Sequence, residues 1–151
     1  MKQALVCASF GTTVENGQLD LLSVENALHD VAGNCEFACA VTSRVIRKRL
    51  AMRGQMTESL PEVLQRLCDA GYAEVAVQPT HLLYGYEYDK IKAEIAPYND
   101  RFNRLKLGEP LLANTQDLQN VAVALAQSYP RQDAEALVLM GHGTEHFAGV
   151  V

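Results

Sequence analysis

The sequence has no long apolar run and no excess of positive charge. No stretch approaches the roughly 18 consecutive apolar residues of a membrane-spanning helix, so we expect no membrane span. The N-terminal segment lacks the apolar core of an export signal, and we therefore expect a cytoplasmic protein. A formal net charge of -5 argues against nucleic acid as the main partner, because nucleic-acid binders usually carry a basic excess.

Cysteine is sparse and never occurs as Cys-x-x-Cys. The four cysteines, Cys7, Cys35, Cys39 and Cys68, all lie on apolar segments. We expect them to be buried free thiols in a reducing compartment. Cys35 and Cys39 would share one face of a strand, but a metal pair there needs more ligands than the segment offers.

Two nucleotide-binding patterns are also missing. The Gly-x-Gly-x-x-Gly fingerprint does not follow the first apolar run, and no P-loop pattern occurs. We therefore expect neither a nucleotide nor a flavin cofactor. A flavodoxin-like redox domain stays open as an alternative, because Ser9 to Thr13 weakly imitates a phosphate-binding loop.

The chain alternates between segments with the patterns of strands and of helices. Strands are predicted at 3–9, 35–42, 73–79, 104–107 and 135–140, and helices at 18–32, 43–52, 59–71, 87–96 and 115–128. The predicted helix caps are Ser43, Ser59 and Thr115. Such alternation predicts an α/β fold in which helices cover a parallel sheet.

One segment occurs twice. Residues 4–12 read Ala-Leu-Val-Cys-Ala-Ser-Phe-Gly-Thr, and residues 136–144 read Ala-Leu-Val-Leu-Met-Gly-His-Gly-Thr. This similarity predicts a duplicated unit, with a first half at 1–132 and the first strand and loop of a second half at 133–151. The polar stretch 129–133 would be the boundary between them.

Ligands of open parallel sheets bind beyond the carboxyl ends of the strands, and polar residues of this chain gather there. The predicted strand ends carry Ser9, Phe10, Gly11, Thr12 and Thr13; Thr42 and Ser43; Thr80, His81, Gly85, Glu87 and Tyr88; and Gly141, His142 and Gly143. The sequence therefore predicts a site at one edge of the sheet.

His142 is the strongest candidate for chemistry, because it lies between two glycines and imidazole can accept a proton or bind a divalent metal. A pair of metal ligands at His142 and His146 is an alternative arrangement. His81 is either a hydrogen-bonded wall residue or a ligand, and Glu87 either a ligand or proton relay or a carboxylate that complements a helix dipole.

Aromatic and basic residues near these loops allow two further interpretations. Tyr84, Tyr86 and Tyr88 offer ring faces to a flat ligand or pack internally. A basic segment, Arg44, Arg47, Lys48, Arg49 and Arg53, is either a solvated helix face or a patch that attracts a polycarboxylate.

An ordered set of motifs resembles the anaerobic sirohydrochlorin cobalt chelatases, the long two-domain form among the class II chelatases, which need no ATP. The motifs are Ser-Phe-Gly-Thr-Thr, Thr-Ser-Arg-Val-Ile-Arg-Lys-Arg-Leu, His-Leu-Leu-Tyr-Gly-Tyr-Glu-Tyr-Asp-Lys-Ile, Gly-Glu-Pro-Leu-Leu and Met-Gly-His-Gly-Thr-Glu-His. The resemblance covers all 151 residues.

The resemblance implies two flavodoxin-like halves that face each other across a tetrapyrrole cleft. It further implies insertion of Co²⁺ into sirohydrochlorin on the oxygen-independent route to cobalamin. His142 would be a metal ligand and the base for a pyrrole proton. The family's other ligands, a glutamate and a second histidine, belong to the second half, beyond residue 151.

For the first half, the resemblance makes Glu87 a cleft residue. With it, Ser9, Phe10, Thr12 and Tyr88 are the predicted substrate-binding residues. We expect the chain to be a fragment of a chelatase with a flavodoxin-like three-layer sandwich. A symmetric pair of copies that restores a cleft, and a non-catalytic tetrapyrrole or metal carrier, stay open as alternatives.

Overall fold

A computed structural model describes residues 1–130 and 135–146 of the chain. Four strands form one parallel sheet in the order β2-β1-β3-β4. They are β1 (Gln3–Ser9), β2 (Glu36–Val41), β3 (Glu74–Pro79) and β4 (Arg104–Leu107). The predicted α/β class with a parallel sheet is thus confirmed, and the strand order is consistent with a flavodoxin-like three-layer fold.

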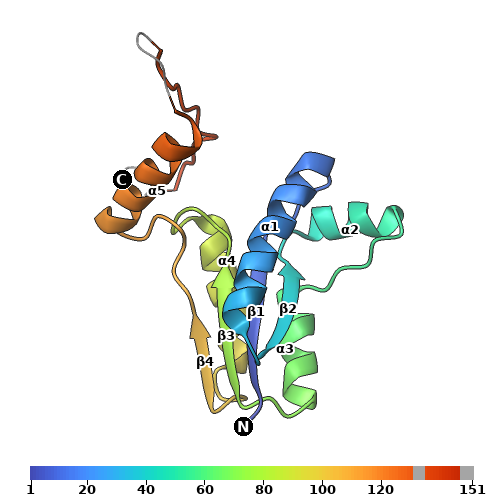
Figure 1. Ribbon diagram of the computed structural model, residues 1–151. Helices are drawn as coiled ribbons and strands as arrows, with labels where there is room; N and C mark the ends of the chain where they lie inside the picture. The colour runs from blue at the N-terminus through green and yellow to red at the C-terminus, as the bar shows by residue number, and fades with distance from the viewer. Residues whose placement is uncertain (131–134, 147–151) are drawn as a thin grey trace.

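Five α-helices and one short 3-10 helix connect and flank the strands in the described part of the chain. They are α1 (Glu15–Ala32), α2 (Arg44–Met52), α3 (Leu60–Asp69), α4 (Tyr86–Ile95), η1 (Ala96–Tyr98) and α5 (Thr115–Ser128). In Figure 1, α1 lies on one face of the sheet, and α3 and α4 lie on the other. None of the helices in the described residues is long and apolar enough to cross a membrane.

The core lies between the sheet and the layer formed by α3 and α4. Leu60, Val63, Leu64 and Leu67 of α3 are completely buried, because their spacing places all four on one face of the helix. Ser59 caps this helix as predicted, in a reciprocal capping box with Glu62. This layer therefore supplies most of the apolar burial that holds the sheet.

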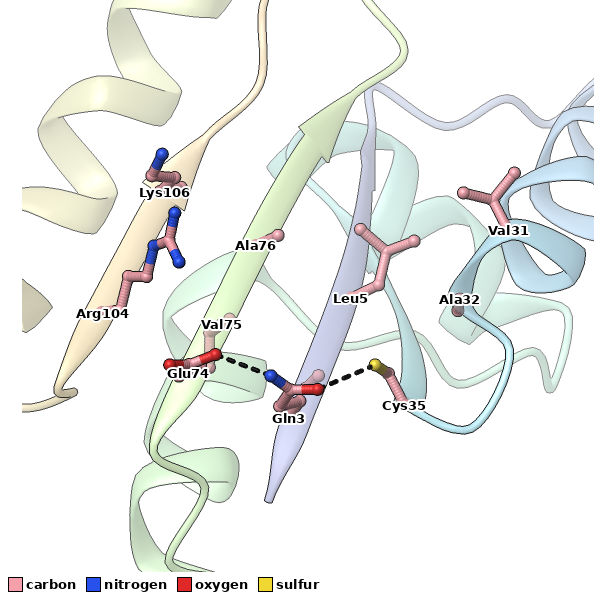
Figure 2. Close-up of a pocket in the computed structure, with 11 residues that line it drawn as sticks. Gln3, Leu5, Val31, Ala32, Cys35, Glu74, Val75, Ala76, Arg104 and Lys106 are labelled. Carbon is pink, nitrogen blue, oxygen red and sulfur yellow. Dashed lines mark hydrogen bonds between the residues drawn. The ribbon is translucent and has the colours of Figure 1, made fainter. Parts of the chain in front are cut away.

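The opposite face of the sheet is only partly covered. The sole buried residue of α1 is Ala32, and Val31 is 80% exposed. Beside α1, a hollow of about 340 Å³ extends over the amino ends of the strands, with Leu5 and Ala76 on its floor (Figure 2). It is uncovered sheet surface at the amino ends of the strands, away from the predicted site.

Two cap predictions have different outcomes. Ser43 caps α2 as predicted, accepting a hydrogen bond from the Ile46 amide. The prediction of Thr115 as the cap of α5 is wrong, because the Asn114 side chain accepts from the Asp117 amide and Thr115 is the first residue inside the helix.

The strand predicted at 135–140 is also wrong, because these residues have no regular secondary structure. A strand needs a neighbour for its backbone hydrogen bonds, and the sheet that the structure describes ends at β4. Leu137 and Leu139 instead line a hollow against α5, together with Leu118 and Leu125. The predicted boundary between the two halves, after residue 132, lies outside the described residues.

The expectation of four buried cysteines is wrong for three of them. All four are free thiols, as predicted, but only Cys7 is buried. Cys35 and Cys68 are half-buried, and Cys39 is exposed. The apolar pattern of 35–42 did not reveal that β2 is an edge strand, so that Cys39 is left partly uncovered.

Candidate functional site

The carboxyl ends of β1, β2 and β3 meet at one edge of the sheet. The Thr42 amide donates to the Ser9 carbonyl at 2.8 Å, and the Thr80 amide donates to the Ala8 carbonyl at 3.0 Å. From β1 the chain continues to β2 on one side, while β3 lies on the other side of β1. This is the switch point at which open parallel sheets bind ligands.

Five polar residues at this edge, which we name the strand-end cluster, are Ser9, Thr42, His81, Glu87 and Lys90. Lys90 contacts two of the others: its ammonium donates to the Thr42 carbonyl at 2.6 Å and lies 3.9 Å from Glu87 Oε2. Glu87 and Lys90 share one face of α4, three residues apart.

The strand-end cluster holds several buried polar atoms without a hydrogen-bond partner among the described residues. They are Ser9 Oγ, Thr42 Oγ1, Glu87 Oε2 and both ring nitrogens of His81. Buried polar atoms are nearly always paired, since an unpaired one costs about 1–3 kcal/mol. Their concentration at the switch point is typical of a site that a ligand or ordered water completes.

The surroundings of His81 favour the neutral form of its imidazole. Burial lowers the pKa of His81 from its ordinary value, and the nearby Lys90 charge lowers it further, whereas Glu87 opposes both effects. Neither ring nitrogen of His81 has a hydrogen-bond partner among the described residues. The interpretation of His81 as a hydrogen-bonded wall residue therefore finds no support in this part of the chain. A neutral imidazole can accept a proton or bind a cation.

The loop after β1 is shaped by Gly11. Its φ is +81°, and a Cβ at this position would lie 2.5 Å from Val41 Cγ1 and 3.0 Å from Ile46 Cγ2. Only glycine fits without displacing these side chains. Of the predicted substrate residues here, Phe10 is 44% exposed, and the Thr12 hydroxyl accepts from the Val14 amide at 3.1 Å.

The three tyrosines around α4 have different surroundings. Tyr88 is 7% exposed, donates its hydroxyl to the Gly108 carbonyl at 3.1 Å and meets Tyr84 edge-to-face. The structure therefore gives Tyr84 and Tyr88 mainly packing contacts. Tyr86 is 64% exposed and contacts the ring of His146.

His142 is exposed and belongs to the irregular segment 135–144. Four residues later, His146 is buried, with its Nε2 3.3 Å from Asp89 Oδ2 in the first turns of α4. Because α4 begins at the carboxyl edge of the sheet, His146 anchors this segment beside that edge. Within residues 1–130 and 135–146, no group of three or more His, Cys, Asp or Glu side chains is placed to hold a metal ion.

The basic segment forms α2, directly after the carboxyl end of β2. Arg47 lies 3.6 Å from Glu62, and Arg53 donates to the Thr13 carbonyl at 2.8 Å. Arg44, Lys48 and Arg49 are exposed. The patch near the site thus consists mainly of these three side chains.

Sequence reasoning missed Lys90 and Glu94. Burial raises the pKa of Glu94, while Lys90 and Arg47 counter this effect, so these charges extend the strand-end cluster toward α2. The spacing Glu87, Lys90, Glu94 on one helix face was the signal that could have found them.

A parallel sheet in flavodoxin-like order, with a cluster of polar side chains at its carboxyl edge, defines an α/β protein of the open-sheet class. Residues 3–151 match the family described as cobalt chelatase (CbiK). The chain belongs to this family, which confirms the family that its motifs resemble.

Two curated relatives are similar over nearly the whole chain. A sirohydrochlorin cobaltochelatase of Salmonella typhimurium is 36% identical over 154 residues, which cover 98% of this chain and 57% of the relative. A sirohydrochlorin cobaltochelatase CbiKC of Nitratidesulfovibrio vulgaris is 33% identical over 149 residues, covering 96% of this chain and 53% of the relative. The chain thus spans about half the length of these relatives.

Proposed function

We propose that this chain provides one half of a sirohydrochlorin cobaltochelatase. The complete enzyme would insert Co²⁺ into sirohydrochlorin without ATP, in anaerobic cobalamin biosynthesis. The observation that carries this proposal is the strand-end cluster, whose unpaired buried polar atoms lie at the switch point of a chelatase-family sheet. Both relatives are named for this activity.

The chemistry requires that two pyrrole protons leave the macrocycle as the metal enters. We assign one proton to His142 and make the same imidazole a ligand of the incoming Co²⁺. Its exposure supports this role, because an accessible imidazole can meet a flat macrocycle. Neutral imidazole suits Co²⁺, and the remaining ligands would come from outside residues 1–151.

The strand-end cluster supplies the polar wall of the first half. We assign substrate contacts to Ser9, Phe10, Thr12 and Glu87, with Glu87 carrying the carboxylate nearest the macrocycle, and an indirect part in substrate binding to Tyr88. Tyr88 would contribute through the packed ring that supports the loop, since its hydroxyl is already bonded to Gly108. Neither nucleotide nor flavin takes part in this proposal.

The test separates binding from turnover. The 151-residue chain is titrated with sirohydrochlorin and then with Co²⁺, and both steps are followed by the absorption spectrum of the tetrapyrrole. Metal insertion above the uncatalysed rate supports catalysis by this half. Binding without insertion favours the non-catalytic carrier, and no binding of the tetrapyrrole contradicts the proposal.

The role of His142 needs its own variant. In a chain with chelatase activity, His142→Ala should lower the insertion rate by about 10²-fold or more, because it removes both a ligand and a base. His29→Ala, on an exposed position of α1, is the matched control and should leave the rate unchanged. An unchanged rate in His142→Ala would remove this residue from the mechanism.

A further inference from the structure

A pair of thiols lies on the face of the sheet that α1 covers, two residues along the strands from the Leu5 floor of the hollow in Figure 2, and the chelatase proposal does not use it. Cys7 on β1 and Cys39 on β2 are direct partners in the parallel ladder. Both side chains face α1, because they alternate with core residues such as Val6 and Ala38 that face α3. The two thiols are therefore neighbours on one face of the sheet.

The two thiols differ in access. Cys7 is completely buried, whereas Cys39 is exposed and lines a cavity of about 490 Å³ between α1, β2 and the segment that joins α2 to α3. Glu25 of α1 lines the same cavity. A small solute that enters the cavity thus meets the Cys39 sulfur and the Glu25 carboxyl, but not Cys7.

The surroundings of the three groups set their acidities. The neighbouring Cys7 lowers the pKa of the Cys39 thiol, and burial raises the pKa of Glu25, which makes its carboxylate a better base. The neighbouring Cys39, followed by burial, raises the pKa of Cys7. Because Cys39 is also the thiol that the cavity exposes, it is the nucleophile of the pair.

We propose that Cys39 and Cys7 form an oxidation-sensitive pair, in which a hydroperoxide oxidises Cys39 and Cys7 then closes a disulfide between β2 and β1. Registered residues on neighbouring strands lie about 4.8 Å apart, within the range of about 4.4–6.8 Å between Cα atoms that a disulfide spans. The proposal is independent of chelatase activity, because it concerns thiol chemistry alone.

The reaction has two balanced steps. Glu25 accepts the Cys39 proton, and the thiolate attacks the terminal peroxide oxygen; an S–O bond forms, the O–O bond breaks, and the leaving oxygen takes a proton. The Cys7 sulfur then attacks the Cys39 sulfenic acid; an S–S bond forms, the S–O bond breaks, and the hydroxide leaves with the Cys7 proton as water. The two thiols are oxidised, and the hydroperoxide is reduced to water and an alcohol, or to water alone from hydrogen peroxide.

The first step prepares the second. A sulfenic acid at Cys39 removes the neighbouring thiolate that raises the pKa of Cys7. Cys7 thereby becomes a better attacking group once Cys39 is oxidised.

The experiment uses the reduced 151-residue chain and hydrogen peroxide at equimolar amounts. Free thiols are then alkylated, and the chain is cleaved after glutamate, since cuts at Glu15, Glu25 and Glu36 place Cys7, Cys35 and Cys39 on separate peptides. We expect a peptide pair joined through Cys7 and Cys39, lighter than its two reduced peptides by two hydrogen atoms. Cys39 should react at least about tenfold faster than the half-buried Cys35.

Three variants make the assignment specific. Cys7→Ser should accumulate a sulfenic acid at Cys39, trapped by dimedone, and give no cross-link. Cys39→Ser should leave Cys7 reduced, whereas the double variant Cys35→Ser and Cys68→Ser should cross-link as the unaltered chain does. Circular dichroism checks that each variant folds. Oxidation of Cys39 no faster than of Cys35, or a cross-link only to another cysteine or another chain, would overturn the proposal.

Discussion

At the scale of single residues, the candidate site contains two positions at which the surrounding side chains restrict the residue type. Gly11 combines a φ of +81° with side chains of Val41 and Ile46 at the place where a Cβ would lie. His81 combines burial with two unpaired ring nitrogens in the described part of the chain. The sequence placed both residues in strand-end loops. It did not reveal the crowding at Gly11 or the unpaired ring of His81, because both depend on residues about 30 or more positions away or on another element.

Gly11→Ala should destabilise the fold by about 3 kcal/mol, since it adds left-handed strain to a clash with two stiff β-branched side chains. Gly54→Ala is the matched control, because its φ is +78° but nothing lies within 4 Å of the added Cβ. Gly54→Ala should lower the free energy of unfolding only by the left-handed strain, about 1–2 kcal/mol. Urea unfolding measures both, and equal losses would show that the loop after β1 adapts to a side chain.

His81 predicts a pH dependence of stability. A pKa below the ordinary 6.5 means that the folded state binds fewer protons than the unfolded state, so stability falls as the pH drops through the unfolded value. His81→Gln removes this titration and should flatten the dependence between about pH 7.5 and pH 5.5. Burial raises the pKa of Glu25 and Glu94, and their contributions cancel when the two chains are compared.

The measurement is the urea midpoint of both chains across this pH range. A variant whose stability changes with pH in the same way as that of the wild-type chain would contradict the lowered pKa of His81.

At the scale of elements, the two faces of the sheet are unequal. The α3 helix buries four large aliphatic side chains completely, whereas Leu19 of α1 is 60% exposed. The helix at 18–32 was predicted from apolar spacing and the helix at 59–71 from the signals at its ends, and neither gives the depth to which a helix face is covered. Sequence patterns therefore located the helices, and only the packing distinguished them.

Leu64→Ala should cost about 3 kcal/mol of unfolding free energy, because it leaves a cavity in the closed layer. Leu19→Ala, the same change on the open face, should cost less than about 0.5 kcal/mol. Chemical denaturation of both variants tests the contrast. A loss in Leu19→Ala that matches the loss in Leu64→Ala would mean that α1 is covered in solution.

At the scale of the whole molecule, the sequence predicted the sheet well and its last strand wrongly. The strands up to β4 follow from apolar runs between turn residues, and each finds a neighbour in the sheet. Residues 135–140 have the same composition but pair with no strand of the described sheet; Leu137 and Leu139 line a hollow against α5, whereas Val138 and Met140 are exposed. Composition determines which segments can form strands, whereas pairing requires a partner that no local pattern reveals.

Charge distribution also belongs to this scale. The chain carries a formal net charge of -5, which would repel a polycarboxylate tetrapyrrole, yet Arg44, Lys48 and Arg49 are exposed beside the site. The proposed substrate requires that this local patch attract it against the field of the whole molecule.

Lys48→Gln with Arg49→Gln should therefore slow the association of sirohydrochlorin by about tenfold at low salt, because it removes local attraction while the overall repulsion remains. Raising the salt to about 0.5 M should largely abolish the difference, since screening shortens the reach of both charges to a few ångströms. Arg104→Gln with Lys106→Gln removes the same charge from β4, on the opposite edge of the sheet, and should leave the association rate close to that of the unaltered chain. Stopped-flow absorbance measures the association rate of the unaltered chain and of both double variants. Equal slowing by both pairs would mean that only the net charge matters and that α2 does not guide the substrate.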